Sequence, residues 1–223
     1  MKILLSFLFF LYYLTGFAQN TKPVIEFCPT CLIDELSFPT VQIGVEFSLS
    51  QRLSFYNEIG IKYRKSYYEH SDTSFVGSKG IKLKTELRYN LLNTKKFLKN
   101  AYIAVNAFYN YRTHNTTIGY YYQKDTLNDR VDGFGVKKSV YGLNFVLGLK
   151  RTIWKNFSFN PYAGLGLRFV NISSIGKEFD SNRDELQQPI DLTVEGYRQW
   201  EDAHGKANDP FNLTLGIRLC YRF

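Results

Sequence analysis

After its first 18 residues the sequence has no apolar run that approaches the roughly 20 residues of a membrane-spanning helix. It is also poor in cysteine, and only two of its three cysteines lie close together, in the stretch Cys28-Pro29-Thr30-Cys31. A structural zinc site takes four ligands, usually from two such pairs, so this single pair does not predict zinc. No strand–helix–strand pattern surrounds the pair, so a thioredoxin-like redox site is not indicated. A local disulfide and two free thiols both remain open, and the odd count leaves at least one thiol unpaired unless another chain supplies a partner.

The N-terminus has the pattern of a secretory signal peptide. Lys2 precedes an apolar run over residues 3–14 that only Ser6 interrupts, and the small residues Gly16 and Ala18 lie before a cleavage point at Gln19. A run of 12 residues is too short to span a bilayer, which disfavours a membrane anchor. No cysteine follows the run at the cleavage point, so a lipoprotein anchor is not expected. We expect residues 1–18 to be the signal peptide and residues 19–223 to form a single domain.

The clearest structural signal lies at the end of the chain. Residues 211–223 read FNLTLGIRLCYRF, in which every odd position is apolar and every even position is polar or small. Alternation with a period of two predicts a β-strand with one apolar face. The 13 residues exceed the 9–11 that a tilted strand needs to cross a bilayer.

Six further stretches alternate in the same way, and short and long connections alternate between them. The seven predicted strands are Val41–Leu49, Leu53–Lys65, Ile81–Leu91, Ala101–Arg112, Val140–Lys150, Phe157–Val170 and Phe211–Phe223. We expect long polar loops over Ser66–Gly80, Thr113–Lys138 and Asn171–Asn208. Porin-like barrels have short periplasmic turns, long extracellular loops and an even number of strands. If the chain ends in the periplasm, an eighth strand must come first, and Pro23–Cys28, with Glu26 and Cys28 on one face, has to supply it.

The two faces of the seven strands differ in charge and in glycine content. One face is apolar and has no charged residue apart from Lys65 at the end of its strand. The other carries Glu46, Glu58, Glu86, Lys62, Arg64, Lys82, Lys84, Arg88, Arg112, Lys150, Arg168, Arg218 and Arg222, together with Gly44, Gly60, Gly142, Gly148, Gly164, Gly166 and Gly216. Glycine weakens a solvent-facing strand without benefit, whereas inside a narrow eight-stranded barrel small residues make room for long side chains. We therefore predict that the charged face lines the lumen and that the apolar face meets lipid, where Lys or Arg near the midplane costs about 2–4 kcal/mol.

Several strand sequences resemble the small outer-membrane β-barrel family common in Bacteroidota, namely PTVQIGVEFSLSQRLSFYNEIGIKY, KLKTELRYNLL and NPYAGLGLRF. The resemblance covers most of the chain after residue 18. It implies an all-β fold, an eight-stranded antiparallel up-and-down transmembrane β-barrel, over residues 19–223. In outer-membrane barrels a terminal aromatic residue is a sorting signal for the assembly machinery, and the resemblance gives this role to Phe223. It implies little about activity, because members of the family mostly lack an assigned biochemical role.

A few polar residues beside the strands raise the question of catalysis. The histidines His70, His114 and His204 fall in or beside three different long loops on the predicted outer side. Possible partners nearby are Ser71, Asp72 and Asp202. A catalytic triad is recognised by geometry, and no motif ties these groups together. The acidic stretch 171–208 lacks the spacing of a calcium loop, and we expect it to be a solvated loop. We therefore assign no catalytic, cofactor-binding or metal residue, and no cofactor.

The expected protein is an integral barrel of the outer membrane of a Gram-negative cell, with a lumen filled by side chains and a structural or interaction role carried by its extracellular loops. It is not expected to be an enzyme. Glu46, Glu58 and Glu86 should each have a cationic partner, because unpaired charge in such an interior is costly. The formal charge of +8 raises the possibility of nucleic acid, but an exported chain rarely meets one. The expected partners are outer-membrane lipid and the assembly machinery, and the barrel is expected to be a monomer. Two alternatives remain: an outer-membrane enzyme acting on lipid A or peptide at the barrel rim, and a secreted lipocalin-like ligand-binding barrel.

Overall fold

The structure is a computed structural model that describes residues 23–34, 37–63, 76–91, 100–187, 200–205 and 210–223. The predicted signal peptide, residues 1–18, lies outside the described residues, and so do Arg64, His70, Ser71 and Asp72. Most of the described residues are in β-strands. A search of this part of the chain finds no helix long and apolar enough to cross a membrane.

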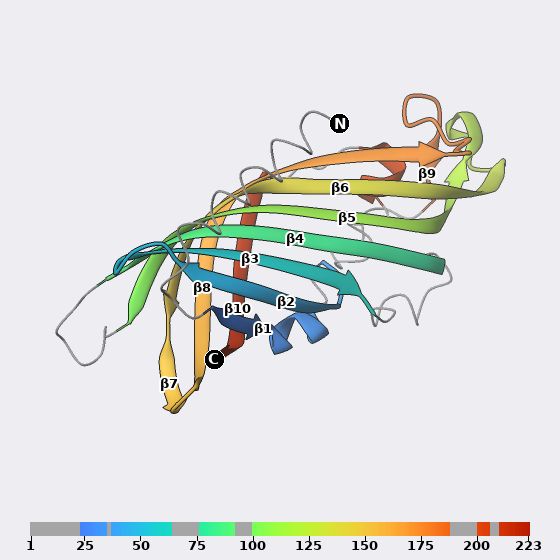
Figure 1. Cartoon of the computed structure of the whole chain (residues 1–223). Helices are drawn as coiled ribbons and strands as arrows, with labels where there is room; N and C mark the ends of the chain where they lie inside the picture. The colour runs from blue at the N-terminus through green and yellow to red at the C-terminus, as the bar shows by residue number, and fades with distance from the viewer. Residues whose placement is uncertain (1–22, 35–36, 64–75, 92–99, 188–199, 206–209) are drawn as a thin grey trace, which may run out of the picture.

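Eight strands form one closed antiparallel sheet (Figure 1). They are β1 (Val24–Phe27), β2 (Thr40–Ser48), β3 (Leu53–Lys62), β4 (Val76–Asn90), β5 (Ala101–Tyr121), β6 (Asp129–Leu149), β8 (Phe157–Ile175) and β10 (Phe211–Arg222). Each strand pairs with its neighbours in this order, and β10 pairs with both β8 and β1, which closes the barrel. The predicted fold, an eight-stranded antiparallel up-and-down β-barrel, is confirmed.

The eighth strand, which the even strand count of such barrels required, is β1. It has only four residues, yet it joins the two ends of the sheet: Ile25 lies opposite Tyr221 on one side and Val45 on the other. Glu26 points into the barrel and is fully buried, as is Cys28, with which it was expected to share a face. Without β1, the edges of β2 and β10 would expose backbone groups that find no partner in lipid. A weak alternation signal in the sequence therefore corresponds to the strand on which closure depends.

The register of the pairs fixes the width of the barrel. Following the paired residues round the barrel from Tyr221 leads back to β10 at Phe211, a shift of 10 residues. With about 3.3 Å per residue and about 4.8 Å between strands, this stagger tilts the strands by about 40° and gives a backbone radius of about 8 Å. An interior of this size is just wide enough to be filled by side chains.

One wall of the barrel is much taller than the rest. β5 and β6 have 21 residues each and β8 has 19, whereas β2 has 9 and β3 has 10. The prediction of a polar loop over Thr113–Lys138 is therefore wrong, because most of these residues form the upper halves of β5 and β6. The short η3 (Tyr122–Lys124) lies between them. β4 likewise begins before the predicted Ile81, and β8 extends beyond the predicted Val170 to Ile175.

The alternation pattern did not predict the upper part of this wall, because the apolar residues there lie on the opposite face of the strands. In the lower part of β5, Val105 points outward and is exposed, whereas in the upper part Ile118 points inward and is buried. β6 shows the same change between the exposed Leu143 and the buried Val136. The outward positions of the upper part are mostly threonine, asparagine, serine and glycine. The outward side thus meets lipid below and water above, and the change of face marks where the wall leaves the membrane.

Four smaller elements complete the described chain. β7 (Arg151–Trp154) continues the line of β6 and pairs with β8, and β9 (Glu185–Leu186) pairs with the top of β5. η1 (Pro29–Ile33) follows β1 directly, and residues 200–204 form a helical turn before β10. Residues 171–208 were expected to be loop, so β9 and the helical turn are additions that periodicity did not predict.

The outer face of the lower barrel is an apolar band with aromatic borders. Its large exposed side chains include Ile43, Ile59, Leu83, Leu87, Val105, Leu143, Phe145, Leu147, Leu165, Leu213 and Leu215. At its outer border Tyr141 stacks on Phe169, with ring centroids 5.6 Å apart. At its periplasmic border the centroids of Phe157 and Tyr221 are 5.0 Å apart. Aromatic girdles at both borders of an apolar band are typical of transmembrane β-barrels.

Candidate functional site

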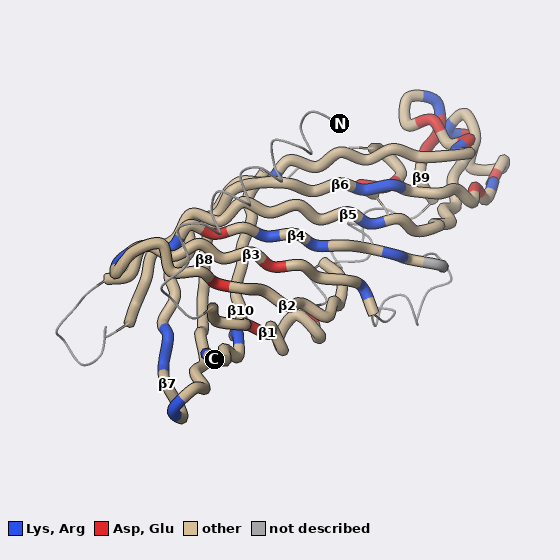
Figure 2. Tube along the Cα trace, in the orientation of Figure 1, with Lys and Arg blue, Asp and Glu red and all other residues tan. Residues whose placement is uncertain are grey.

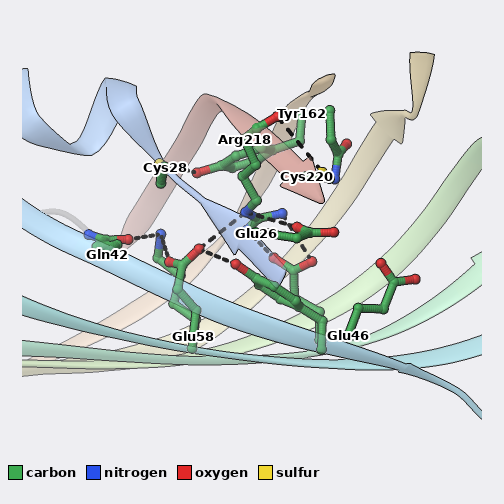
Figure 3. A network of polar contacts seen from close by, with 12 residues as sticks. Glu26, Cys28, Gln42, Glu46, Glu58, Tyr162, Arg218 and Cys220 are labelled. Atoms are coloured by element: carbon green, nitrogen blue, oxygen red, sulfur yellow. Dashed lines mark hydrogen bonds and ion pairs between the residues drawn. The ribbon is translucent and has the colours of Figure 1, made fainter. Parts of the chain in front are cut away.

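Carboxylates and guanidinium groups from five strands meet in the middle of the lumen (Figure 3). These buried groups are Glu26, Glu46, Glu58, Glu86, Arg88 and Arg218. Their inward direction follows from the two-residue period of the strands. Their contacts follow from the closure and tilt of the barrel, which bring together side chains as distant in sequence as Arg218 and Glu58.

Arg88 binds three carboxylates. Its Nη1 lies 2.7 Å from Glu26 Oε1 and 2.8 Å from Glu46 Oε2, and its Nε lies 2.9 Å from Glu86 Oε2. The ring of Tyr56 lies against the guanidinium, 4.0 Å from centroid to Cζ. Because Arg88 is fully enclosed, removing a carboxylate would leave buried charge uncompensated.

Arg218 extends the same network to the opposite wall. Its Nη2 lies 2.6 Å from Glu86 Oε1 and its Nε lies 3.2 Å from Glu58 Oε2. Glu58 also accepts a hydrogen bond from the Tyr56 hydroxyl at 2.6 Å and pairs with Lys84 at 2.9 Å. Glu86 therefore bridges the two arginines, and the ion pairs form one continuous set across the lumen.

The charges of this set balance. Lys150 pairs with Glu46, and Lys82 Nζ lies 2.8 Å from Asp34 Oδ2. Among the described residues of the lumen these ion pairs join five bases and five acids: Lys82, Lys84, Arg88, Lys150 and Arg218, with Glu26, Asp34, Glu46, Glu58 and Glu86. The prediction that each of the three strand carboxylates has a cationic partner is confirmed. β1 and the first outer loop supply the two acids that balance the set.

Tyrosine rings fill the lumen beside the charges, and glycines make room for them. A Cβ atom at Gly44 would lie 2.3 Å from the Tyr56 hydroxyl oxygen, and one at Gly148 would lie 2.2 Å from the Tyr102 ring. Both glycines therefore face the lumen, as predicted. The side chains they accommodate are tyrosines rather than the long charged groups that we expected. The sequence contained a signal for this, because Tyr56 interrupts the charged face of its strand.

The CxxC pair is a disulfide. Cys28 follows β1 and Cys31 lies in η1, and both are buried. Between them, the Thr30 hydroxyl accepts a hydrogen bond from the Ile217 backbone N–H at 3.1 Å, so the bridged turn is held against β10. Cys220 is a buried free thiol.

The first outer loop is also tied to the lumen. Lys82 Nζ donates to Asp34 Oδ2 at 2.8 Å and to the Phe38 carbonyl at 2.7 Å, and the same ammonium lies over the Phe38 ring. Burial would raise the pKa of Asp34, but the Lys82 ammonium and two hydrogen bonds from Ser37 outweigh it and hold this pKa below its ordinary value. Sequence reasoning did not find Asp34, because its role depends on the path of a loop.

Above the membrane the tall wall has an apolar core of its own. Side chains from β5 and β6 pack with residues from the long connection that precedes β10: Ile118, Tyr120, Phe134, Val136, Phe179 and Ala203. We use "cap" for residues 114–138, 172–187 and 200–205. The Phe179 ring meets Tyr120 edge-on with centroids 5.5 Å apart, and Trp200 stacks on His204 at 4.4 Å. The connection is also fastened by the Asp132 carboxylate, which accepts the Phe179 backbone N–H at 2.9 Å.

A buried polar layer lies beneath this core. His114 Nε2 lies 2.8 Å from Asp202 Oδ2, and Lys138 pairs with Glu201. Burial lowers the pKa of His114 below its ordinary value, although the hydrogen bond to Asp202 opposes the change. Burial would raise the pKa of Asp202, but the contact with His114 outweighs it and keeps this pKa low. The neutral imidazole therefore donates its Nε2–H to the Asp202 carboxylate at neutral pH.

The structure brings two of the three histidines into the cap. His114 lies in β5 rather than in a loop, and it contacts Asp202. His204 lies two residues beyond Asp202, in the helical turn, and its ring faces Trp200 and Phe179. His70 lies outside the described residues. No cluster of three or more metal-ligating side chains occurs in the ranges that the structure covers.

The outer face of the lower barrel settles which medium surrounds it. A secreted barrel would place this apolar band inside and its charges outside, the reverse of what is observed. Even the polar residues of this face satisfy each other: Thr85 lies opposite Asn57 on the next strand, and its hydroxyl donates to the Asn57 side chain at 2.9 Å. A closed, even-stranded barrel with such a surface spans a membrane, and single-chain barrels of this kind are outer-membrane proteins. The protein is accordingly an integral β-barrel of the outer membrane.

Comparisons with known proteins give structural neighbours only. No protein-family model matches the chain, and no curated protein shows significant sequence similarity to it. A major outer membrane protein from Thermus thermophilus is similar with a TM-score of 0.42 and 15% identity, over 92% of this chain and 100% of that one. CarO2 of Acinetobacter baumannii gives a TM-score of 0.43 and 10% identity, over 91% and 98%. CarO of the same organism gives 0.42 and 11%, over 91% and 97%.

Proposed function

We propose that the barrel is a plugged membrane anchor that presents its extracellular cap to partners, and that it neither conducts solutes nor catalyses a reaction. The observation that supports this proposal most strongly is the balanced ion-pair network across the lumen. Arg88 and Arg218 are fully buried there, and each binds at least two carboxylates. An open pore needs a water-filled path, whereas these groups are desolvated and linked from wall to wall.

The network would resist opening on energetic grounds. Separating a buried, hydrogen-bonded ion pair leaves charge without compensation and costs about 3–5 kcal/mol. Tyr56 and Tyr102 occupy the space between the charged groups, and the first outer loop is bound across the lumen by Lys82 and Asp34. A conducting state would have to break several of these contacts together.

Planar-bilayer recording tests the plug. The unmodified protein should show no steady conductance above that of the bare membrane, and insertion is verified in the same lipid by quenching of Trp154 with brominated chains. A large, steady, anion-selective conductance would overturn the proposal and make the protein a small porin. The measurement is repeated with Glu58→Ala, which should weaken the barrel without opening it.

In this proposal the cap is the part of the molecule that contacts partners outside the cell. Its fold is held by its own apolar core and by the contacts of Asp132, Glu201 and Asp202, so its shape does not depend on the lumen. An enzyme at the rim is disfavoured because His114 and Asp202, the only two of the polar residues considered for catalysis that are in contact within the described chain, are buried beneath that core. Hydrolysis assays with lipid A and with peptides should give no turnover, and turnover lost in His114→Gln would favour the enzyme.

The partner assignments follow from the same proposal. The barrel is expected to act as a monomer, to contact outer-membrane lipid, and to be recognised by the assembly machinery through Phe223, with no nucleic-acid partner. Its strand sequences support membership of the small outer-membrane barrel family of the Bacteroidota type. Crosslinking in intact cells tests the interaction role. Specific crosslinks from an introduced photoreactive residue at the exposed Leu127, but not from one at Tyr109 on the outer face of β5 below the cap, would support presentation by the cap.

A further inference from the structure

Basic residues without acidic ones lie at the periplasmic end of the described barrel. Of 28 bases and 20 acids in the chain, five of each form the balanced lumen set. Apart from Lys150 of the lumen set, the described residues between strands at the periplasmic end, together with the last residues of the chain, contain four bases and no acid: Arg52, Arg151, Lys155 and Arg222. The described part of this end is therefore positively charged.

Three of these bases gather at one corner of the barrel. Arg151 lies in β7 opposite Phe159, Lys155 lies in the turn between β7 and β8, and Arg222 ends β10. The Arg222 backbone N–H donates to the Asn156 carbonyl at 3.0 Å, which joins the end of β10 to that turn. Figure 2 shows the basic positions of β7 and its tip close to the C-terminus, with no acidic position among them. We use "basic corner" for Arg151, Lys155 and Arg222.

Exposed apolar side chains lie directly beside the basic corner. Ile153 is 68% exposed and Trp154 is 74% exposed, both in β7. Phe223 lies next to Arg222, and its ring centroid is 5.1 Å from that of Tyr221. Aromatic side chains placed at the end of a lipid-facing band lie at the level of the lipid headgroups. The bases therefore lie at the height of the phosphates of the periplasmic leaflet.

We propose that the basic corner binds the headgroups of anionic phospholipids in the periplasmic leaflet. Positive side chains near a membrane surface attract anionic lipid, and the attraction falls off within a Debye length. The adjacent Trp154, Ile153 and Phe223 favour lipid over a soluble polyanion, because a soluble polymer gives no reason to expose apolar rings beside the charges. This inference does not depend on the plug or on the role of the cap.

The tryptophan content of the protein provides the test. The chain has two tryptophans, Trp154 beside the basic corner and Trp200 in the cap, so Trp200→Phe leaves a single reporter at the proposed site. This variant is reconstituted in phosphatidylcholine vesicles that contain a minor fraction of brominated phosphatidylglycerol or, in the parallel sample, of brominated phosphatidylcholine. Phosphatidylglycerol should quench Trp154 severalfold more strongly at low salt, and the preference should shrink as salt is added. Equal quenching by the two lipids would overturn the proposal.

Charge variants locate the effect. Replacing Arg151, Lys155 and Arg222 by glutamine should remove the preference, with each charge contributing roughly a two- to fivefold change in enrichment. The matched control replaces Lys124, Arg130 and Lys137 in the cap by glutamine, which removes the same charge from the other end and should leave quenching unchanged. If the triple variant does not assemble, Lys155→Gln alone and the salt titration of the Trp200→Phe protein decide. Competition by soluble inorganic polyphosphate, without any preference for phosphatidylglycerol, would instead indicate a polyanion and contradict the lipid assignment.

Discussion

Below the level of Tyr109, Tyr141 and Phe169 the tall wall turns most of its large apolar side chains outward, whereas above that level most of them point inward. The strands are continuous through the change, and the backbone pairing of β5 with β6 is unbroken from Ala101 to Tyr121. Only the surrounding medium differs. The alternation of apolar and polar residues along a strand therefore shows which face contacts water. A reversal of this alternation within one strand marks the border of the membrane.

The two regions also hold their interiors together in different ways. The lumen is filled with paired charges and tyrosine, while the cap encloses an apolar core around Phe179. In the lower barrel lipid already accepts the apolar face, so the narrow interior is left to polar groups, which must then satisfy one another. In the cap water surrounds the sheet, and burial of apolar surface is again what stabilises the fold.

The largest expected difference between the two interiors comes from removing one acid from each. Glu58→Ala should destabilise the barrel by about 3–5 kcal/mol, because Lys84 and Arg218 would be left buried without a counter-charge. Glu201→Ala breaks the pair with Lys138 in the cap and should leave the thermal unfolding of the barrel nearly unchanged. Unfolding of both variants in the same detergent gives the comparison, and equal losses would contradict the view that the lumen network carries the stability of the barrel.

The outer faces of the two regions can be compared within one strand. Val105→Arg puts a charge on the lipid face of β5 and should cost about 2–4 kcal/mol, with reduced insertion. Asn115→Arg lies on the same side of the same strand above the membrane and should change stability by no more than about 0.5 kcal/mol. Folding yield into vesicles measures both. A similar penalty at the two positions would place the membrane border higher than the aromatic level.

The two ends of β10 allow a smaller comparison. Phe223→Ala should lower the amount of assembled barrel in cells more than it lowers the stability of barrel already assembled, because one exposed ring contributes at most about 1.5–3 kcal/mol. Phe211→Ala removes a similar lipid-facing ring at the other end of the strand and should not affect assembly. If both variants reduce assembly alike, or if Phe223→Ala reduces stability as much as assembly, the signal role of Phe223 is wrong.

The sequence was informative wherever one medium acted along a whole strand. Alternation identified the strands of the lower barrel, and parity recovered β1 although it has four residues. The upper halves of β5 and β6 were missed because their outward residues are mostly polar and their apolar residues point inward. A search for strands with an apolar outer face therefore assigns them to a loop. The seven glycines named from the sequence indicated the correct face, but the pattern could not show that Gly44 accommodates Tyr56.

The contacts of the candidate sites were less predictable than their residues. Glu26, Glu46 and Arg88 could be placed on inward faces, but their meeting depends on the stagger of the closed barrel, which no local pattern contains. The pairing of Asp34 with Lys82 depends on how a loop crosses the lumen, and that of His114 with Asp202 on how a distant helical turn packs on the wall. The alternation along a strand determines the direction in which a side chain points, whereas the tertiary fold determines which partner it meets.

The smallest expected effect is a loss of cap stability in mild acid that the barrel does not share. His114 is outside the membrane-spanning part, and its pKa in the folded cap lies below the ordinary value of 6.5 because it is buried, with Arg112 and Lys138 adding to the change. An unfolded cap therefore takes up a proton as the pH falls below about 6.5, while the folded cap does not, so cap stability is lost as the pH falls. The lowered pKa of Asp202 acts in the same direction below its ordinary value of 3.8. The cap should loosen in mild acid.

Trp200 reports this change once Trp154→Phe has removed the other tryptophan. Its emission should shift toward that of exposed tryptophan as the pH is lowered from about 7 to about 5, while the strand signal in circular dichroism stays constant. His204→Gln serves as the control, because the ring of His204 stacks directly on the reporter Trp200. The shift should persist in that variant and shrink in His114→Gln, in which the amide can still donate to Asp202 but cannot be protonated. A shift that vanishes only with His204 would show that the cap stays closed and that the two regions respond to acid alike.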